Sequence, residues 1–236
     1  MESPISRGFF GKRRPDPSRV PPGQYVTHDF PVLSAGPTPH VPTETWTLSI
    51  VGDVEEEATY SWDELLALPH ETVTRDIHCV TKWSKLDTAW TGISLDTLLE
   101  PAGPSGEFLS ISSYDGYTTN LPLEDVLDGK AWIAFAYDDE PLEAEHGGPA
   151  RLLVPHLYFW KSAKWVRGLR LTLEDEPGFW EAAGYHNRGG AGADATTRSP
   201  IVSFTDRPGS AARARGHHDR DSRAAPRSPA RRRAGP

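Results

Sequence analysis

The sequence FLSISSYDGYTTNL occupies residues 108–121. Apolar and polar side chains alternate along both halves of it, which is typical of strands that bury one face. Asp115 and Gly116 lie between the halves, and an Asp-Gly pair supplies the positive backbone angles that a tight hairpin turn requires. This segment therefore predicts a β-hairpin.

The sequence on either side of the hairpin predicts further short strands and a few short helices. We expect strands at residues 46–50, 73–80, 132–137, 151–155 and 164–173. Ser61 and Glu64 form a capping-box pattern before a helix that Pro69 ends, Ser94 precedes a helix at 95–99, and a third helix is expected at 123–127. Because the helices do not alternate regularly with the strands, the predicted class is α+β with mixed sheets.

Charge divides the 236-residue chain into unlike parts. Residues 189–236 contain 10 Arg and 4 Asp, so residues 1–188 hold the other 15 basic and 29 acidic side chains, a net charge of −14. In residues 189–236, 31 of 48 positions are Ala, Gly, Pro or Arg, which predicts a disordered basic tail. We expect one domain at residues 24–188, preceded by a Pro/Arg-rich arm at 1–23.

Composition also excludes several classes of protein. The acidic domain argues against nucleic acid or an anionic membrane as a partner, because both bind cationic faces. One cysteine excludes an intrachain disulfide framework and Cys-rich metal sites. No apolar run approaches the ~20 residues that span a bilayer. Pro15, Asp16 and Pro17 follow Arg13-Arg14 where an export signal has an apolar core, so we expect a cytoplasmic protein.

Cys79, the single cysteine, is the first candidate for chemistry. His78, Lys82 and Lys85 lie near it in the sequence, and adjacent cations lower a thiol pKa. The alternative is that Cys79 is a small buried hydrophobic residue. The spacing of these residues does not decide between the two.

Two later segments also carry candidate site residues. Residues 145–155 place two glycines and a proline between His146 and Arg151, an arrangement that brings backbone and side chains close to a ligand. The Arg151 guanidinium suits a phosphate, although a surface ion pair is the commoner role of an arginine. Residues 158–165 interleave aromatic residues with two lysines, and the acidic domain argues against a nucleic-acid stacking surface there.

Together these segments resemble the molybdenum-binding domain of the sulfite oxidase family, most closely its short prokaryotic branch. The resemblance covers about residues 23–189. It rests on five motifs that follow one another along the chain. They are DIHCVT at 76–81 (followed by Trp90-Thr91-Gly92), YDGYTTNLPL at 114–123, HGGPAR at 146–151, KSAKW at 161–165 and PGFW at 177–180.

The resemblance implies a role for each candidate residue. Cys79 is implied to be the protein's thiolate ligand to molybdenum, whose other sulfur ligands come from a single molybdopterin. The pterin and its phosphate are implied to contact Ser112, His146, Arg151, Ser162, Ala163 and Lys164. Tyr117 is implied to reach the substrate pocket and Trp90 to line it.

The chain departs from animal and plant sulfite oxidases in ways that bear on the substrate. Their oxyanion-binding arginines are absent after the cysteine and in the loop at residues 33–37, although Lys82, Lys85 or Arg75 could supply the charge. Their dimerisation and haem domains are also absent. We therefore expect a monomer that passes electrons to a separate partner and acts on a small oxyanion or sulfur compound.

The implied reaction is two-electron oxygen-atom transfer, or its reverse on an S-oxide or N-oxide. Two other classes remain open. One is a hydrolase with Cys79 as nucleophile and His78 or His146 as base, and the other is a binding module without cofactor. The resemblance ends at Gly190, so the tail is either a natural disordered segment or the product of a shifted reading frame.

Overall fold

A computed structural model of the protein describes residues 16–190, so the predicted tail after Gly190 and most of the N-terminal arm lie outside the described residues. The strands are β1 (Tyr25–Val26), β2 (Thr47–Gly52), β3 (Ala58–Ser61), β4 (Glu71–His78), β5 (Trp83–Ser94), β6 (Phe108–Ser113), β7 (Thr118–Pro122), β8 (Trp132–Tyr137), β9 (Glu140–Pro141), β10 (Arg151–Leu153) and β11 (Val166–Thr172). The α-helices are α1 (Trp62–Leu66), α2 (Leu95–Leu99) and α3 (Phe179–Ala182). Short 3-10 helices are η1 (Pro17–Arg19), η2 (Thr43–Thr45), η3 (Glu100–Ala102), η4 (Leu123–Asp125), η5 (Ala144–His146) and η6 (Phe159–Lys161).

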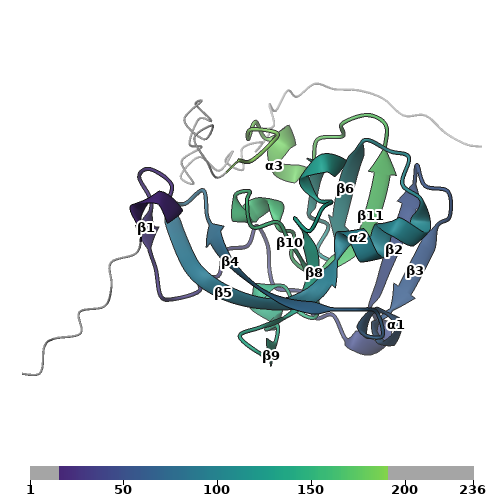
Figure 1. Ribbon diagram of the computed structural model, residues 1–236, viewed down its shortest axis with the longest axis horizontal. Helices are drawn as coiled ribbons and strands as arrows, with labels where there is room; N and C mark the ends of the chain where they lie inside the picture. Colours follow the sequence, from purple (N-terminus) through teal and green to yellow (C-terminus); the bar gives the residue numbers. More distant parts are fainter. Residues whose placement is uncertain (1–15, 191–236) are drawn as a thin grey trace, which may run out of the picture. The chain divides into compact units, whose positions relative to one another are not determined.

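Two mixed sheets organise these elements, as predicted for the fold class (Figure 1). The first has the order β1-β5-β8-β10, with β4 also paired to β5 and β9 to β8. The second has the order β3-β2-β11-β6-β7. β1 pairs with β5 and β11 with β2 in parallel, and the other strand pairs are antiparallel.

Local sequence signals placed most of the elements correctly. The predicted hairpin is confirmed as β6 and β7, which pair antiparallel across the Asp115-Gly116 turn. The Ser61 capping box begins α1, and the Ser94 side chain accepts from the Asp96 backbone at the start of α2. The helix predicted at 123–127 is the single 3-10 turn η4. The sequence patterns did not predict β5, which is twelve residues long and joins β1, β4 and β8.

β10 and the first half of β8 are buried on both faces of the first sheet, and strand alternation assigns each of their residues to one face. Leu152 packs into the larger core with the second sheet, whereas Leu153 packs with Cys79 and Trp90 in a smaller cluster. The preceding Arg151 lies on the same side of β10 as Leu153, and its guanidinium lies over the Trp90 ring. β10 therefore turns Arg151 toward the cluster that contains the cysteine.

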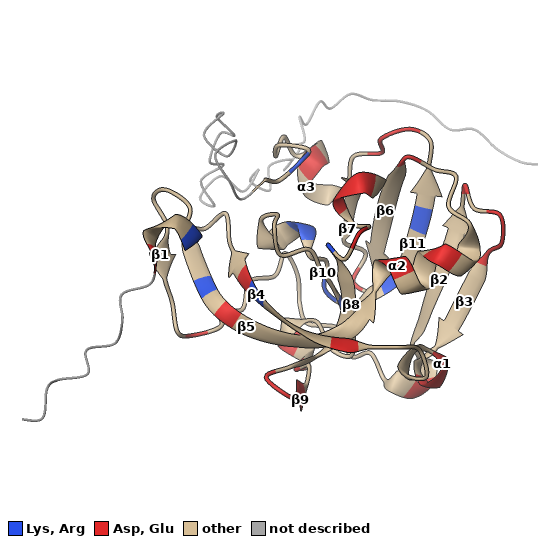
Figure 2. Ribbon diagram, in the orientation of Figure 1, with Lys and Arg blue, Asp and Glu red and all other residues tan. Residues whose placement is uncertain are grey.

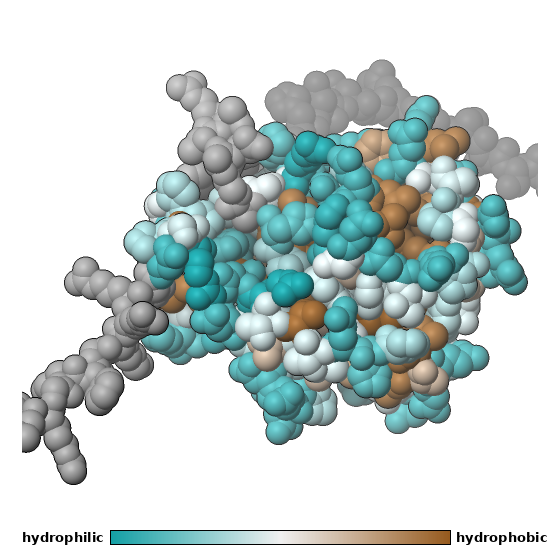
Figure 3. Space-filling view, viewed as in Figure 1, coloured by the Kyte–Doolittle hydropathy of each residue, from teal (hydrophilic) through white to brown (hydrophobic). Residues whose placement is uncertain are grey.

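The surface is polar and largely acidic. Asp and Glu residues lie on the helices and loops around both sheets (Figure 2), and the face shown in Figure 3 is mainly hydrophilic with scattered apolar residues. Among residues 16–190, no helix is long and apolar enough to cross a membrane.

Candidate active site and cofactor-binding residues

Cys79 lies in the turn between β4 and β5. Its backbone N–H donates to the Trp83 carbonyl at 2.8 Å, and its carbonyl accepts from the Lys82 N–H at 3.0 Å. The thiol is 6% exposed, and its sulfur lies 3.0 Å from the Thr81 hydroxyl. Burial raises the pKa of the Cys79 thiol, although the hydrogen bonds with Thr81 act in the opposite direction.

The basic side chains that lie near Cys79 in the sequence are not among the groups that shift the pKa of its thiol. His78 turns its ring to the Ser84 hydroxyl at 2.9 Å, and Lys85 donates to the His28 carbonyl at 2.6 Å. Lys82 is exposed, with a positive φ of 75°. The thiol of the protein alone is thus a buried neutral group, which does not favour the hydrolase alternative.

Aromatic rings surround Cys79 in the smaller cluster. Trp90 is 1% exposed, donates its indole N–H to the Thr88 hydroxyl at 2.8 Å, and packs edge-on against Phe30 and Tyr137. Phe159 of η6 packs against the same cluster. Trp90 and Cys79 therefore belong to the same buried cluster.

Arg151 is a buried cation without a carboxylate partner among residues 16–190. It is 2% exposed and donates to the His146 carbonyl at 2.7 Å and the Ser162 carbonyl at 2.6 Å. Its guanidinium lies 4.0 Å from the centre of the Phe159 ring. Burial lowers the pKa of Arg151 to about 9, which records the cost of holding this charge in an apolar environment.

Lys164 is a second cation beside Arg151. Its ammonium donates to the Ser34 hydroxyl at 2.7 Å and to the Glu145 carbonyl at 2.8 Å. Burial, with the charge of Arg151, lowers the pKa of Lys164 to about 8. Gly147, at a φ of 107°, permits this approach, because a Cβ there would lie 3.0 Å from the Lys164 side chain and 3.1 Å from that of Arg151.

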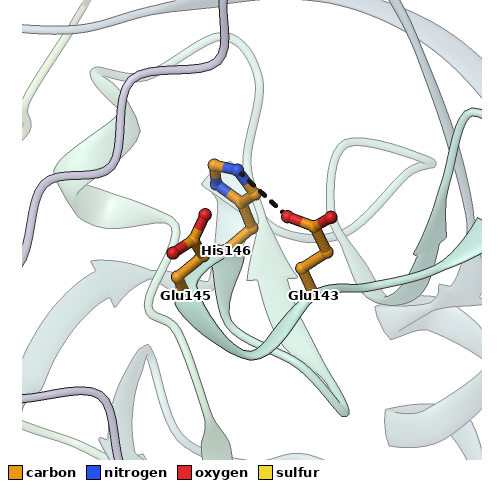
Figure 4. A group of neighbouring side chains, drawn as sticks. All are labelled: Glu143, Glu145 and His146. Carbon is orange, nitrogen blue, oxygen red and sulfur yellow. Dashed lines mark ion pairs between the residues drawn. The ribbon is translucent and has the colours of Figure 1, made fainter.

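His146 lies beside these two cations. Its ring stacks on Phe30 with 3.9 Å between centroids. Burial and the Arg151 charge lower the pKa of His146, against the opposite effect of Glu143 and Glu145. Figure 4 shows the imidazole between these two exposed carboxylates, with Glu143 paired to it at 3.8 Å.

The backbone at residues 161–163 lies against Arg151 and β10. The Ser162 hydroxyl accepts from the Val154 N–H at 2.9 Å, and the Ala163 carbonyl accepts from the Leu152 N–H at 2.8 Å. The buried Arg151 and the half-buried Lys164 place two positive charges here, and neither has a carboxylate within ion-pair distance among residues 16–190. An anionic group such as a phosphate fits this place, because both cations would gain the partner that they lack.

Ser112 and Tyr117 are not part of this cationic group. The Ser112 hydroxyl lies against Gly168 of the neighbouring strand, within 2.7 Å of where a Cβ would stand. Tyr117 packs against the larger core and donates its hydroxyl to the Trp160 carbonyl at 2.7 Å. This bond joins it to η6, which carries both Trp160 and Phe159. Burial, followed by the charge of Glu181, raises the pKa of the Tyr117 phenol.

Three contributors to this region were not predicted from the sequence. Phe30 lies beneath His146, and no local pattern marks it as more than a loop residue. Lys161 is fully buried and pairs with Glu181 of α3 at 2.5 Å, where the sequence suggested only an aromatic and basic strip. The Trp83 indole N–H is buried and has no hydrogen-bond partner in the described part of the chain, residues 16–190.

Comparisons with known proteins find related sequences. Residues 35–180 match the family model described as "Oxidoreductase molybdopterin binding domain". The chain is 47% identical over 186 residues to "Uncharacterized oxidoreductase YuiH" of Bacillus subtilis, covering 77% of this chain and 94% of that protein. It is 28% identical to "Putative protein-methionine-sulfoxide reductase subunit YedZ1" of Azospira oryzae, covering 75% of this chain and 70% of the relative.

A solved structure shares the fold. The sulfane dehydrogenase SoxCD from Paracoccus pantotrophus superposes with a TM-score of 0.54 at 26% sequence identity. The match covers 58% of this chain and 41% of the SoxCD chain.

Proposed function

Because the chain belongs to the family of oxidoreductase molybdopterin-binding domains, we propose that it carries a molybdenum cofactor with one pterin and that the Cys79 thiolate is the protein's ligand to molybdenum. Two observations about Cys79 support this. It is the one cysteine of the chain, and it is buried among aromatic rings. A thiolate is a soft donor of the kind that such a centre takes. Since burial raises the pKa of Cys79, binding the metal must displace the proton from its sulfur.

The uncompensated charge of Arg151 and Lys164 is the observation that carries the proposal. Neither cation has a carboxylate partner among the described residues, and Arg151 lies over the same aromatic rings that pack with Cys79. We assign Arg151 and Lys164 to the pterin phosphate, with His146, Ser162 and Ala163 lining the same place. Ser112 stays assigned to the pterin on the resemblance alone.

The bound cofactor would supply two-electron oxygen-atom transfer, and the chain's residues would bind and orient the reactants. Trp90 and its neighbouring rings exclude water from one side of Cys79. Tyr117 keeps its proton, because burial raises its pKa, and donates it to the Trp160 carbonyl. Its role toward the substrate stays assigned on the resemblance alone. Lys82, the exposed cation in the cysteine turn, is the group available to attract an oxyanion.

Reduction of an S-oxide is the second candidate for the direction of reaction. The name of the Azospira relative and the aromatic surroundings of Cys79 favour it, since rings suit a neutral organic sulfur compound. We propose to assay the loaded protein for sulfite oxidation with an artificial electron acceptor and for methionine sulfoxide reduction with an artificial donor. Turnover of either compound, lost in Cys79→Ser, supports oxygen-atom transfer, whereas molybdenum-loaded protein inactive in both assays argues against these substrates.

We further propose that the protein is a cytoplasmic monomer and passes electrons to a separate protein. The acidic surface favours a partner with a positively charged face. Association that weakens as salt is added would support such a partner.

A further inference from the structure

A segment before residue 35, and so outside the family match, lies against the turn that carries Cys79. Residues 21–24 form a tight turn in which the Gln24 N–H donates to the Pro21 carbonyl at 3.1 Å. Gly23 has a φ of 80°, the value that a type II turn requires after Pro22. β1 then pairs with β5, as the Tyr25 N–H donates to the Lys82 carbonyl at 2.9 Å.

The Gln24 side chain links the two arms of the cysteine turn. Its amide N–H donates to the Cys79 carbonyl at 3.2 Å, and its amide oxygen accepts from the Ser84 hydroxyl at 2.5 Å. The orientation of the Gln24 amide follows from the Cys79 carbonyl, which can only accept a hydrogen bond and must therefore face the amide nitrogen. Ser84 has a single proton, so the His78 ring nitrogen 2.9 Å away must donate to Ser84.

A second contact anchors the same segment on the hairpin. Arg19 donates to both carboxylate oxygens of Asp76, at 2.8 and 2.5 Å, and to Asp87 at 2.5 Å. Asp76 precedes the cysteine turn on β4, and Asp87 follows it on β5. The segment from Arg19 to Gln24 is thus fastened at both ends to the hairpin that presents Cys79.

We propose that Gln24 is a positioning residue for the Cys79 thiolate, an inference that rests on the assignment of Cys79 as the molybdenum ligand. The Gln24 side-chain amide bridges the Cys79 carbonyl and the Ser84 hydroxyl, and this bridge fixes the direction in which the turn presents the Cys79 sulfur. Among residues 16–190, the hydrogen bonds of the Gln24 side chain join the Cys79 carbonyl and the Ser84 hydroxyl, and none joins the thiol or the proposed phosphate site. Loss of the Gln24 side chain should therefore change the position of the Cys79 thiolate and leave the charge around the cofactor unchanged.

The test uses the full chain with Gln24→Met, which keeps the length of the side chain and removes both hydrogen bonds. Tyr25→Phe is the matched control, because that ring is 60% exposed and the change preserves the backbone bonds of β1. Gln24→Glu, which keeps the acceptor for Ser84 and removes the donor to Cys79, serves if the Met variant folds poorly. Two readouts are used, the rate at which an aromatic disulfide reagent modifies the cofactor-free protein and the electron paramagnetic resonance signal of Mo(V) in the loaded protein.

The thiol rate is unambiguous because Cys79 is the single cysteine. Losing two hydrogen bonds of ordinary strength predicts about a tenfold faster modification in Gln24→Met, a shifted Mo(V) signal, and wild-type values for Tyr25→Phe. A thiol rate and a Mo(V) signal both equal to those of the wild type would overturn the proposal. Full molybdenum content in Cys79→Ser would instead refute the assignment of Cys79 as the ligand. The rate of thiol modification in Gln24→Met would still report on the geometry of the cysteine turn.

Discussion

The buried ion pair between Lys161 and Glu181 makes a sharp prediction about stability. The ammonium of Lys161 lies 2.5 Å from the Glu181 carboxylate, and the two side chains are 0% and 2% exposed. Lys161 also donates to the Asn120 carbonyl at 2.6 Å, and the same Glu181 oxygen accepts from the Thr119 hydroxyl at 2.7 Å. This network joins α3 and β7 to η6, the turn that places Phe159 against the cysteine cluster.

Glu181→Gln preserves shape but leaves the Lys161 charge buried without its counter-charge. Removing one partner of a buried pair costs about 3–5 kcal/mol. For a domain of this size, a loss of that order lowers the Tm by about 10 °C. Lys161→Met should cost a similar amount, and the double variant Lys161→Met with Glu181→Leu should cost less than the sum, because it removes both charges together.

Urea titration followed by tryptophan fluorescence measures these differences. The control is Glu124→Gln, which breaks the Arg188–Glu124 pair at 2.6 Å, where both side chains are more than 60% exposed. Exposed pairs contribute at most about 1 kcal/mol, so this variant should unfold near the wild-type midpoint. Equal effects of Glu181→Gln and Glu124→Gln would refute the reasoning that burial sets the cost.

Three further predictions concern the proposed cofactor site. Arg151→Met removes a buried charge that lacks a carboxylate partner among residues 16–190, so relief of desolvation should offset most of the free energy of the lost hydrogen bonds. We expect the free energy of unfolding of the cofactor-free protein to fall by no more than about 2 kcal/mol in a urea titration. We also expect metal analysis of this variant to show that molybdenum is lost. Because Lys164 has a lowered pKa of about 8, the folded cofactor-free protein binds fewer protons than the unfolded chain between that pH and the ordinary lysine value. Its contribution to the free energy of unfolding should therefore rise with pH across this window, and Lys164→Met should remove that slope; identical pH profiles would contradict it. Tyr117→Phe should slow turnover of the accepted substrate by about 10- to 1,000-fold if its hydroxyl acts on the reacting oxygen, and an unchanged rate with both sulfite and sulfoxides would remove Tyr117 from the substrate pocket.

Local signals in the sequence predicted most of the fold, because caps, tight turns and alternation depend on neighbouring residues. The hairpin at 108–121 and the capped helices α1 and α2 are examples. β5 escaped prediction because its pattern is irregular. It contains Asp87 at a φ of 56°, and its register with β8 shifts between Thr91 and Gly92, so the side chains change face within one strand.

In the candidate site too, residues that lie in local motifs were predicted, and residues that reach the site through long-range contacts were not. Arg151, Ser162 and Lys164 lie in compact motifs, and the structure brings their backbone or side chains together around β10. Phe30 and Gln24 belong to the site region through contacts with residues more than 50 positions away, which no local pattern records. The basic residues near Cys79 in the sequence illustrate the opposite error. Their closeness suggested an activated thiol, but in the folded protein His78 contacts Ser84 and Lys85 contacts the His28 carbonyl.

Metal analysis of the wild type and Cys79→Ser, both purified from a host that makes molybdopterin, tests the central claim most directly. The proposal predicts about one molybdenum per chain in the wild type, from one thiolate and one pterin, and little or none in the variant at equal folding. A wild type without molybdenum, or a variant that keeps it fully, would contradict the assignment of Cys79 as the ligand.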